Sequence, residues 1–302
     1  MYLVCDKSRK GAQLLHPFEY VRAKSVDEAV AALAKHGERA RPLAGGTDVL
    51  VMARAGRWEL DALVDIKHIP ETNIVELGAS EFRLGAAVPC YRIYEDDEIS
   101  AKFPCLVDTA SIIGGIQIQS RAGLGGNLCN ASPSADGIGP LIVHHATCVI
   151  AGPNGTREVA VEDFCTGPGR SVIGNGEFLV EMKMPIPRKG FGAAYERFTP
   201  RNEMDIAIAG VASSVQLNGN IIESARIALA SVGPTPILSS AGDQLAGKEA
   251  TAENFSAAAQ AAIADTSPIS DMRGTVEQRK HLVGVLTRRT LERAVERARE
   301  NN

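Results

Sequence analysis

Residues 117–136 read QIQSRAGLGGNLCNASPSAD, a stretch with three glycines within four residues, Gly123, Gly125 and Gly126, followed by small polar side chains. A core strand would use larger residues, because glycine costs backbone entropy and packs no side chain. A flexible linker would not be followed at once by the apolar run at 138–143. The composition favours a backbone that comes very close to a polar group.

Two interpretations of this stretch stay open from its composition. Successive N–H groups in glycine-rich turns form anion-binding concavities, which favours a phosphate-bearing cofactor. Glycine clusters also mark ordinary tight turns at strand ends. Residues 43–50, LAGGTDVL, favour the cofactor, because they place a second pair of glycines far upstream after an apolar segment. Two such segments can hold one extended ligand from both sides.

The composition of the whole chain excludes several classes of protein. Its 302 residues suit two domains or three small ones. A net charge of −4 and only 5% aromatic residues argue against a nucleic-acid partner, which needs a basic face and stacking side chains. The first residues show no signal peptide, and no apolar segment is long enough to span a membrane. We therefore expect a cytoplasmic protein.

The cysteines and histidines give no metal-binding pattern. No Cys-x-x-Cys occurs, so we expect buried free thiols at Cys5, Cys90, Cys105, Cys129, Cys148 and Cys165. Adjacent His144 and His145 would point in different directions from a helix, which argues against a metal site. The P-loop, the Rossmann fingerprint, the His-Glu-x-x-His motif and the Gly-x-Ser-x-Gly elbow are also missing from the sequence.

Hydrophobic periodicity predicts an α/β beginning. A capping box at Ser25–Glu28 starts a helix, and a second helix is expected at 49–54, directly after the first glycine pair. This places that pair at a strand end, where α/β sheets bind ligands. Further strands are predicted at 63–66, 73–77, 82–87, 147–151, 157–161 and 176–184, and helices at 104–113 and 136–145.

The last third of the chain has a different pattern. Pro185 and Pro187 mark a domain boundary. Strands are expected at 191–198, 206–217 and 221–230, the last two joined by an Asn-Gly hairpin turn. Two helices follow at 253–264 and 277–299, and we expect the arginines of the second to lie in solvent. The expected parts are residues 1–60, 61–186 and 187–302.

Five motifs in order resemble the FAD-binding medium subunit of molybdenum hydroxylases, the xanthine dehydrogenase and carbon monoxide dehydrogenase family. They lie at 44–48, 117–136, 164–169 (FCTGPG), 177–179 (EFL) and 197–207. The resemblance runs the length of the chain. It implies an α+β fold with a two-subdomain FAD-binding domain of the p-cresol methylhydroxylase and vanillyl-alcohol oxidase type. A C-terminal domain with a three-stranded antiparallel sheet and helices should follow.

The resemblance also implies which residues hold FAD. Gly45, Gly46 and Thr47 should donate to the diphosphate, and Asp136 should hold a ribose or adenine edge. Arg197 should place a positive charge near the flavin, where several members have lysine. Either Phe178 or Leu179 should pack near the adenine or the flavin. The full expected set is Leu43, Ala44, Gly45, Gly46, Thr47, Asp48, Val49, Gly123, Leu124, Gly125, Gly126, Asn127, Asn130, Ser132, Asp136, Phe178, Leu179 and Arg197.

The chain departs from the family pattern at two positions. Gly123 stands where many members have serine or threonine, so one side-chain hydrogen bond is lost. Cys129 stands where the benzoyl-CoA reductase branch begins a cysteine-rich insertion that carries an extra iron–sulfur cluster. Asn-Ala-Ser-Pro follows Cys129 here without an insertion. We therefore expect no cluster and no metal in this chain.

The resemblance implies an electron-transfer subunit. Its partners would be a small subunit with two [2Fe–2S] clusters and a large subunit with the molybdenum cofactor, assembled as a dimer of heterotrimers. The large subunit would hydroxylate the substrate, so we expect no catalytic side chain here. The alternative is a stand-alone FAD-dependent reductase on the same fold, which would need an acid beside Arg197 and Arg201. In a cofactor-free scaffold, a third possibility, the glycines would be mere turns.

Overall fold

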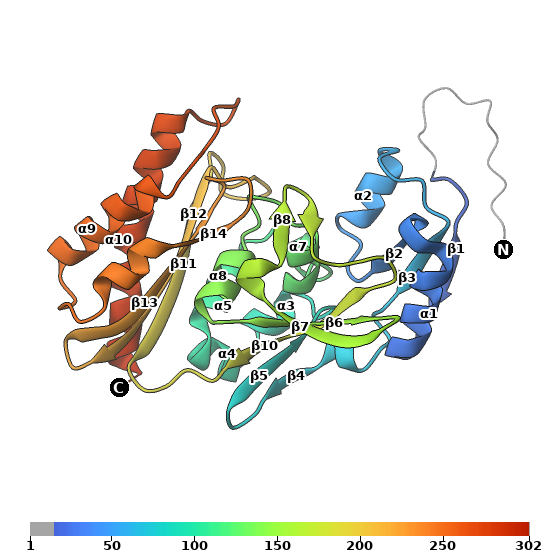
Figure 1. Ribbon diagram of the computed structural model, residues 1–302, viewed down its shortest axis with the longest axis horizontal. Coiled ribbons are helices and arrows are strands. Elements are labelled where there is room, and N and C mark those ends of the chain that lie inside the picture. Colours follow the sequence, from blue (N-terminus) through green and yellow to red (C-terminus); the bar gives the residue numbers. More distant parts are fainter. Residues whose placement is uncertain (1–14, 302) are drawn as a thin grey trace.

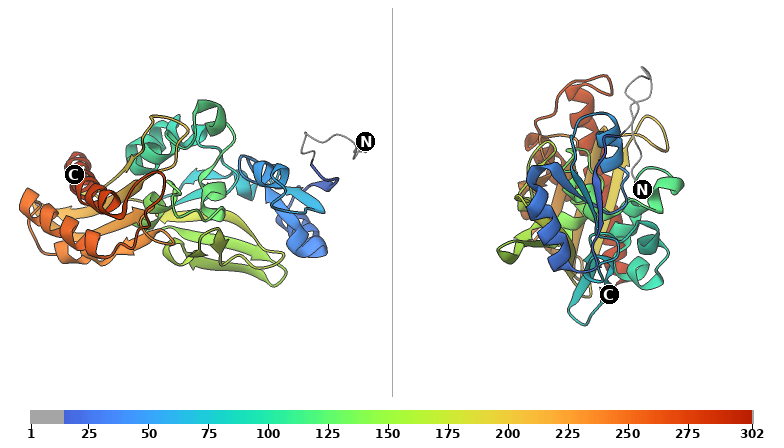
Figure 2. Two further views of the ribbon diagram at one scale, coloured as in Figure 1. Left: turned by 90° about the horizontal axis from the view of Figure 1, so that it is seen from above. Right: turned by 90° about the vertical axis from the view of Figure 1, so that its right-hand side faces the viewer.

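The computed structural model describes residues 15–301, which form three parts in a row (Figure 1). The N-terminal part lies at one end and the C-terminal sheet with its two long helices at the other, an order that a view from above repeats (Figure 2). The expectations of a missing signal peptide and of a buried Cys5 concern residues outside this range. Within it, no helix combines the length and the apolar character needed to cross a membrane.

The first part is a small parallel sheet with strand order β1-β3-β2. Its elements are β1 (Glu19–Arg22), α1 (Val26–His36), η1 (Gly37–Arg39), β2 (Ala40–Leu43), α2 (Val49–Arg54) and β3 (Ala62–Asp65). The predicted cap is confirmed, because the Ser25 hydroxyl accepts the N–H of Glu28, while the Glu28 carboxylate accepts the N–H of Lys24. Strand β3 pairs with both β1 and β2, so the first sheet continues past residue 60.

The middle part is an antiparallel sheet with strand order β4-β5-β10-β6-β7. Its strands are β4 (Val75–Leu77), β5 (Glu81–Gly85), β6 (Thr147–Gly152), β7 (Gly155–Ala160) and β10 (Phe178–Pro185). A small hairpin, β8 (Cys165–Gly167) and β9 (Arg170–Ser171), lies outside this sheet. One face of the sheet packs on α1 and β3 of the first part, and the other packs on short helices.

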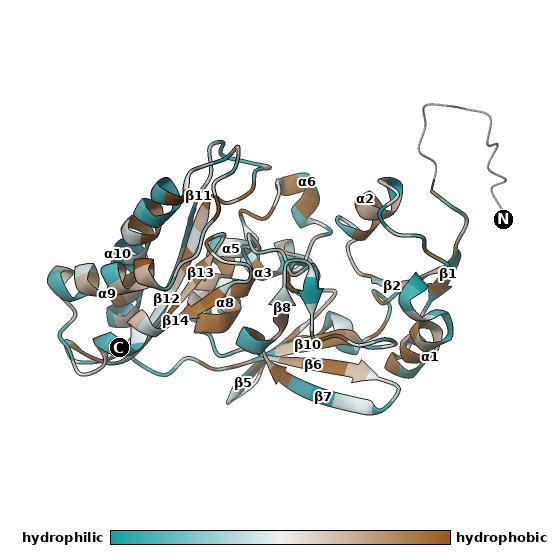
Figure 3. Cartoon of the chain, turned by 45° about the horizontal axis from the view of Figure 1, so that its top comes forward, coloured by the Kyte–Doolittle hydropathy of each residue, from teal (hydrophilic) through white to brown (hydrophobic). Residues whose placement is uncertain are grey.

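These short helices carry much of the middle core. They are α3 (Tyr91–Tyr94), α4 (Asp97–Lys102), α5 (Pro104–Ala110), α6 (Ile116–Gln119), α7 (Leu124–Cys129) and α8 (Ile138–Val143), with 3-10 turns η2 (Glu71–Asn73) and η3 (Val161–Asp163). All six residues of α8 are buried, and the helix is apolar throughout (Figure 3). It packs on β12 and β13 of the C-terminal sheet and on α5 and α7 of the middle part, so it joins the middle part to the C-terminal part. These two parts are called the two domains below.

The C-terminal part is an antiparallel sheet with α9 (Ala252–Ala264) and α10 (Val276–Glu300) on one face. Its strands are β11 (Phe191–Phe198), β12 (Ala209–Asn218), β13 (Ile221–Ala230) and β14 (Ile237–Ser239), and the turn η4 (Ser240–Leu245) follows. The three long strands lie close to their predicted positions. The short fourth strand was not predicted, because three residues show no usable alternation.

The expectation that the arginines of α10 lie in solvent is wrong for two of them. Arg279 is 4% exposed and donates to the carbonyl oxygens of Ile208 and Ser231. Arg297 is largely buried and forms a two-pronged ion pair with Asp108 of α5, at 2.6 and 2.8 Å. The Arg297 pair therefore ties the last helix to the middle part.

His144, at the end of α8, should make stability depend on pH. Its ring lies 5.1 Å from that of Phe103 and 5.4 Å from that of Phe191, and burial lowers its pKa to about 3. Below about pH 6.5 the unfolded chain takes up a proton that the folded chain refuses. The free energy of unfolding should therefore decrease as the pH is lowered from about 6.5 to 3. This group contributes up to about 1.4 kcal/mol per pH unit to the decrease. Urea unfolding at pH 7, 6 and 5 measures this decrease, which should be smaller in His144→Phe than in the unaltered protein. An equal decrease in both proteins would contradict the role of His144.

Candidate functional site

The two glycine stretches lie against each other, although they are far apart in the sequence. A Cβ atom on Gly45 would stand 2.0 Å from the carbonyl oxygen of Arg121. The Arg121 guanidinium in turn donates to the carbonyl of Gly45 at 3.4 Å. The backbone after β2 is therefore seated directly on the residues that precede Gly123, and only glycine permits this approach.

The second stretch is a short helix rather than the expected loop. Gly123 is the N-cap of α7, and the following glycines lie within its first turn. A Cβ on Gly123 would stand 2.2 Å from the carbonyl oxygen of Val88, and one on Gly125 would stand 2.5 Å from that of Ala86. These two glycines let α7 pack on the backbone that follows β5. A Cβ on Gly126 would meet nothing within 4 Å. Gly126 alone among the three faces open space.

Both stretches present backbone N–H groups that the protein leaves without an acceptor. Among the hydrogen bonds within residues 15–301, none has the amides of residues 45–49 or 123–126 as donor. The first turn of a helix leaves its amides free, and successive free amides bind anions. Because the two sets adjoin, together they could hold an extended, doubly charged group such as the pyrophosphate of a dinucleotide cofactor.

Asp48 adds a free acceptor at the edge of these amides. It is the N-cap of α2, but its side chain makes no capping hydrogen bond. Partial burial raises the pKa of this carboxyl above its usual value, although the residue keeps contact with solvent. A carboxyl oxygen in this position suits a ligand hydroxyl better than a phosphate oxygen.

Two of the expected site residues, Asp136 and Arg197, come from different domains and form an ion pair. Asp136 accepts the hydroxyl proton of Tyr195 at 2.6 Å and pairs with the guanidinium of Arg197. Arg197 also donates to the carbonyl of Ile112 at 2.9 Å. Burial raises the pKa of Asp136, and burial together with Asp136 raises the pKa of Tyr195 well above its usual value. The protein thus engages both carboxyl oxygens of Asp136 and fixes Arg197, while the expected ribose or adenine contact stays a prediction.

The remaining expected residues are distributed between the core and local turns. Phe178 and Leu179 are both buried on opposite faces of β10, the first toward the N-terminal sheet and the second toward the helices. The Asn127 side chain accepts the N–H of Gly137 at 2.9 Å, and that of Ser132 accepts the N–H of Ser134 at 3.2 Å. Asn130 ends α7. Their contacts with a cofactor stay predictions.

Sequence reasoning missed the residues that shape this site through their backbones. Arg121, Val88 and Ala86 supply the carbonyl groups against which the glycines lie. Tyr195 was also missed, although its hydroxyl holds Asp136. For Tyr195 the signal was its place in the YERF segment just before Arg197. For the backbone contacts the sequence carries no signal.

The described cysteines should resist alkylation in the folded protein. Cys90, Cys105 and Cys148 are buried free thiols, as expected, whereas the free thiols Cys129 and Cys165 are only half-buried. Burial nevertheless raises the pKa of Cys129 to about 12. The thiolate is the reactive form, so at pH 8 roughly one Cys129 in 10⁴ is reactive. Iodoacetamide labelling of a Cys5→Ser variant, followed by mass spectrometry, should modify Cys129 only after denaturation. Rapid labelling of Cys129 in the native protein would contradict this expectation.

Both parts of the chain match known protein families. Residues 16–187 match the family described as the FAD binding domain in molybdopterin dehydrogenase. Residues 193–294 match the family described as the CO dehydrogenase flavoprotein C-terminal domain. The carbon monoxide dehydrogenase medium chain of Hydrogenophaga pseudoflava is 34% identical over 278 residues, which cover 92% of this chain and 96% of that protein. The xanthine dehydrogenase FAD-binding subunit of Escherichia coli O157:H7 is 32% identical over 279 residues, covering 91% and 95%.

Solved structures extend this likeness to the fold. A structure of carbon monoxide dehydrogenase from Hydrogenophaga pseudoflava that lacks the Mo-pyranopterin moiety matches with a TM-score of 0.90 and 33% identity, covering 94% of this chain and 99% of that chain. Quinoline 2-oxidoreductase from Pseudomonas putida 86 matches with a TM-score of 0.88 and 27% identity, covering 95% and 99%. The similarity therefore includes both domains and the junction between them.

Proposed function

This chain belongs to the family of FAD-binding medium subunits of molybdenum hydroxylases, and we propose that it carries electrons from a partner's [2Fe–2S] clusters to an external acceptor. It is an oxidoreductase subunit, and its cofactor is FAD. We propose a small iron–sulfur subunit and a large molybdenum subunit as its partners, in a dimer of heterotrimers. The molybdenum subunit would oxidise the organic substrate. The names of the relatives, medium chain and FAD-binding subunit, support a place in such a complex.

The observation that carries this proposal is the adjoining pair of free amide sets, at residues 45–49 and 123–126. These amides would hold the FAD pyrophosphate, and the open face at Gly126 would admit it closely. Arg197 is held in place by Asp136 and by the carbonyl of Ile112, so its guanidinium is oriented before any ligand binds. When bound, FAD supplies the ability to accept electrons singly and to release them in pairs.

The test is to purify the tagged chain from its native host under conditions that keep complexes intact. We expect an equimolar amount of released FAD, with two further subunits that contain iron, acid-labile sulfide and molybdenum. Native mass spectrometry measures the stoichiometry of the assembly. A chain that purifies alone with FAD and reduces a substrate by itself would support the stand-alone reductase instead. A preparation without flavin would contradict both functions.

A further inference from the structure

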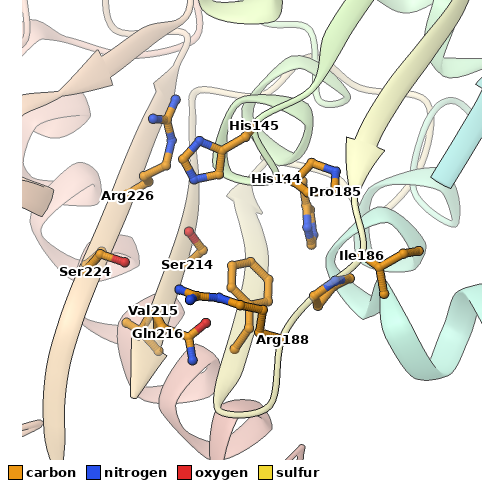
Figure 4. A pocket seen from close by; sticks show the side chains of 13 residues that line it. His144, His145, Pro185, Ile186, Arg188, Ser214, Val215, Gln216, Ser224 and Arg226 are labelled. Carbon is orange, nitrogen blue, oxygen red and sulfur yellow. The ribbon is translucent and has the colours of Figure 1, made fainter. Parts of the chain in front are cut away.

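A pocket of about 190 Å³ lies at the junction of the two domains, and neither glycine stretch lines it. The end of α8, the connector after β10 and one face of β12 and β13 form its walls (Figure 4). Its polar lining residues are His144, His145, Arg188, Ser214, Gln216, Ser224 and Arg226. None of them belongs to the expected FAD-binding set. The volume is small for a drug-sized molecule, so the pocket suits a small ligand or one group of a larger ligand.

The polar lining lies on the face of the C-terminal sheet that packs against the middle part, and along this face the side chains change from apolar to polar. Successive side chains of a strand alternate between faces. On this face β12 and β13 first present Ala212 and Ala228, which belong to the core that includes α8. The next residues on the same face are Ser214 and Gln216 of β12, which pair in register with Arg226 and Ser224 of β13. The face therefore changes from apolar to polar at the pocket.

The lining is rich in polar side-chain atoms that have no hydrogen-bond partner among the described residues. Arg188 is exposed and its side chain makes no hydrogen bond to any described residue, whereas its backbone carbonyl accepts one from the side chain of Asn301. Arg226 uses Nε on the carbonyl of Ile142 and one terminal nitrogen on Glu162, which leaves the other terminal nitrogen free. His144 is 2% exposed, and its Nε2 has no hydrogen-bond partner within residues 15–301. A buried polar atom without a partner is costly, which points to a ligand.

We propose that this pocket is a second ligand site, which binds a phosphate group through Arg188, Arg226 and Ser224. A guanidinium fork matches the oxygen atoms of phosphate. Arg188 comes from the connector, whereas Ser224 and Arg226 come from β13. The Glu162 carboxylate offsets part of the charge of Arg226, so Arg188 provides the main uncompensated charge. A ligand here would bridge the connector to the C-terminal sheet and would stabilise the junction of the two domains.

The experiment is a calorimetric titration of the FAD-loaded complex with inorganic phosphate at constant ionic strength. Loading with FAD keeps phosphate from the amides at the glycine stretches. We expect saturable binding that weakens at least 10-fold in Arg188→Gln, since a charge-assisted pair contributes about 1.5 kcal/mol or more. This variant should fold normally, because Arg188 is exposed and makes no hydrogen bond with its side chain among the described residues. Ser224→Ala, which is also exposed, should weaken binding to a smaller extent.

Lys189→Gln is the matched control, because it removes the same charge from the neighbouring residue, which does not line the pocket. Phosphate binding should be unchanged in this variant. A parallel titration with ADP identifies the source: tighter binding of ADP indicates a nucleotide phosphate, and equal or weaker binding indicates inorganic phosphate. Absence of saturable binding for both, or equal binding by Arg188→Gln and the unaltered protein, would overturn the proposal. Flavin content should be the same in all these variants, so this test is independent of the proposed function.

Discussion

Gly45→Ala should weaken FAD binding on the order of 100-fold or more, because the added methyl group would overlap the carbonyl oxygen of Arg121. A separation of 2.0 Å between the new Cβ and that oxygen is far below any real contact, so one of the two stretches must move. That movement takes the amides of residues 45–49 out of register with those of residues 123–126. Loss of two charge-assisted hydrogen bonds, at about 1.5 kcal/mol each, accounts for the expected factor. Fluorescence titration of the flavin-depleted complex with FAD measures it.

Gly126→Ala is the companion variant, with the same added methyl group at a position where it meets no protein atom within 4 Å. Alanine is favoured over glycine in a helix by up to about 1 kcal/mol, so the flavin-free protein should be equally or more stable. FAD affinity should nevertheless fall, because the methyl group occupies the open face. Opposite changes in stability and affinity would identify Gly126 as a cofactor contact. Unchanged FAD affinity would remove Gly126 from the site, and unchanged affinity in Gly45→Ala would refute the role of the close approach.

These glycines show how far the sequence can lead. Their density predicted an anion-binding backbone, and the family resemblance predicted FAD, which the comparisons support. The sequence could not tell why each glycine is present. Gly45, Gly123 and Gly125 allow backbones to approach, whereas Gly126 leaves a face open. The difference depends on backbone carbonyl groups of residues such as Val88. Every residue has such a carbonyl group, so the composition of the sequence cannot reveal which ones lie close to a glycine.

Secondary structure was predictable where the sequence signal was local. The helix at 49–54 and the strand at 221–230 lie at their predicted bounds. The helix α7 was not predicted, because its glycines are typical of turns and its stability comes from packing on the backbone after β5. The arginines of α10 were misjudged for a related reason. Helical periodicity cannot reveal a partner such as Asp108, which is 189 positions from Arg297.

Asp108→Asn should destabilise the protein by about 3–5 kcal/mol, the range for breaking a buried ion pair by removing one partner. The Asp108 carboxylate is 10% exposed and accepts hydrogen bonds from Arg297, Arg293 and the N–H of Tyr195. Asparagine keeps the size of the side chain but leaves the largely buried guanidinium of Arg297 without a counter-charge. Because Asp108 lies on α5 and both arginines lie on α10, the loss weakens the contact between the two domains. Urea unfolding, followed by circular dichroism, should show a lower midpoint.

Glu196→Gln provides the matched control, since it breaks another ion pair between α10 and its surroundings. Glu196 and Arg289 form this pair at 2.9 Å, with side chains 36% and 60% exposed. Exposed pairs contribute less than about 1 kcal/mol, because water already stabilises both charges. Asp108→Asn should therefore lower stability several-fold more than Glu196→Gln. Equal losses of stability in the two variants would mean that burial does not strengthen the ion pairs of Asp108. A double-mutant cycle with Arg297→Gln then separates the pair energy from the desolvation of the charge left behind, because the coupling vanishes if the two groups act independently.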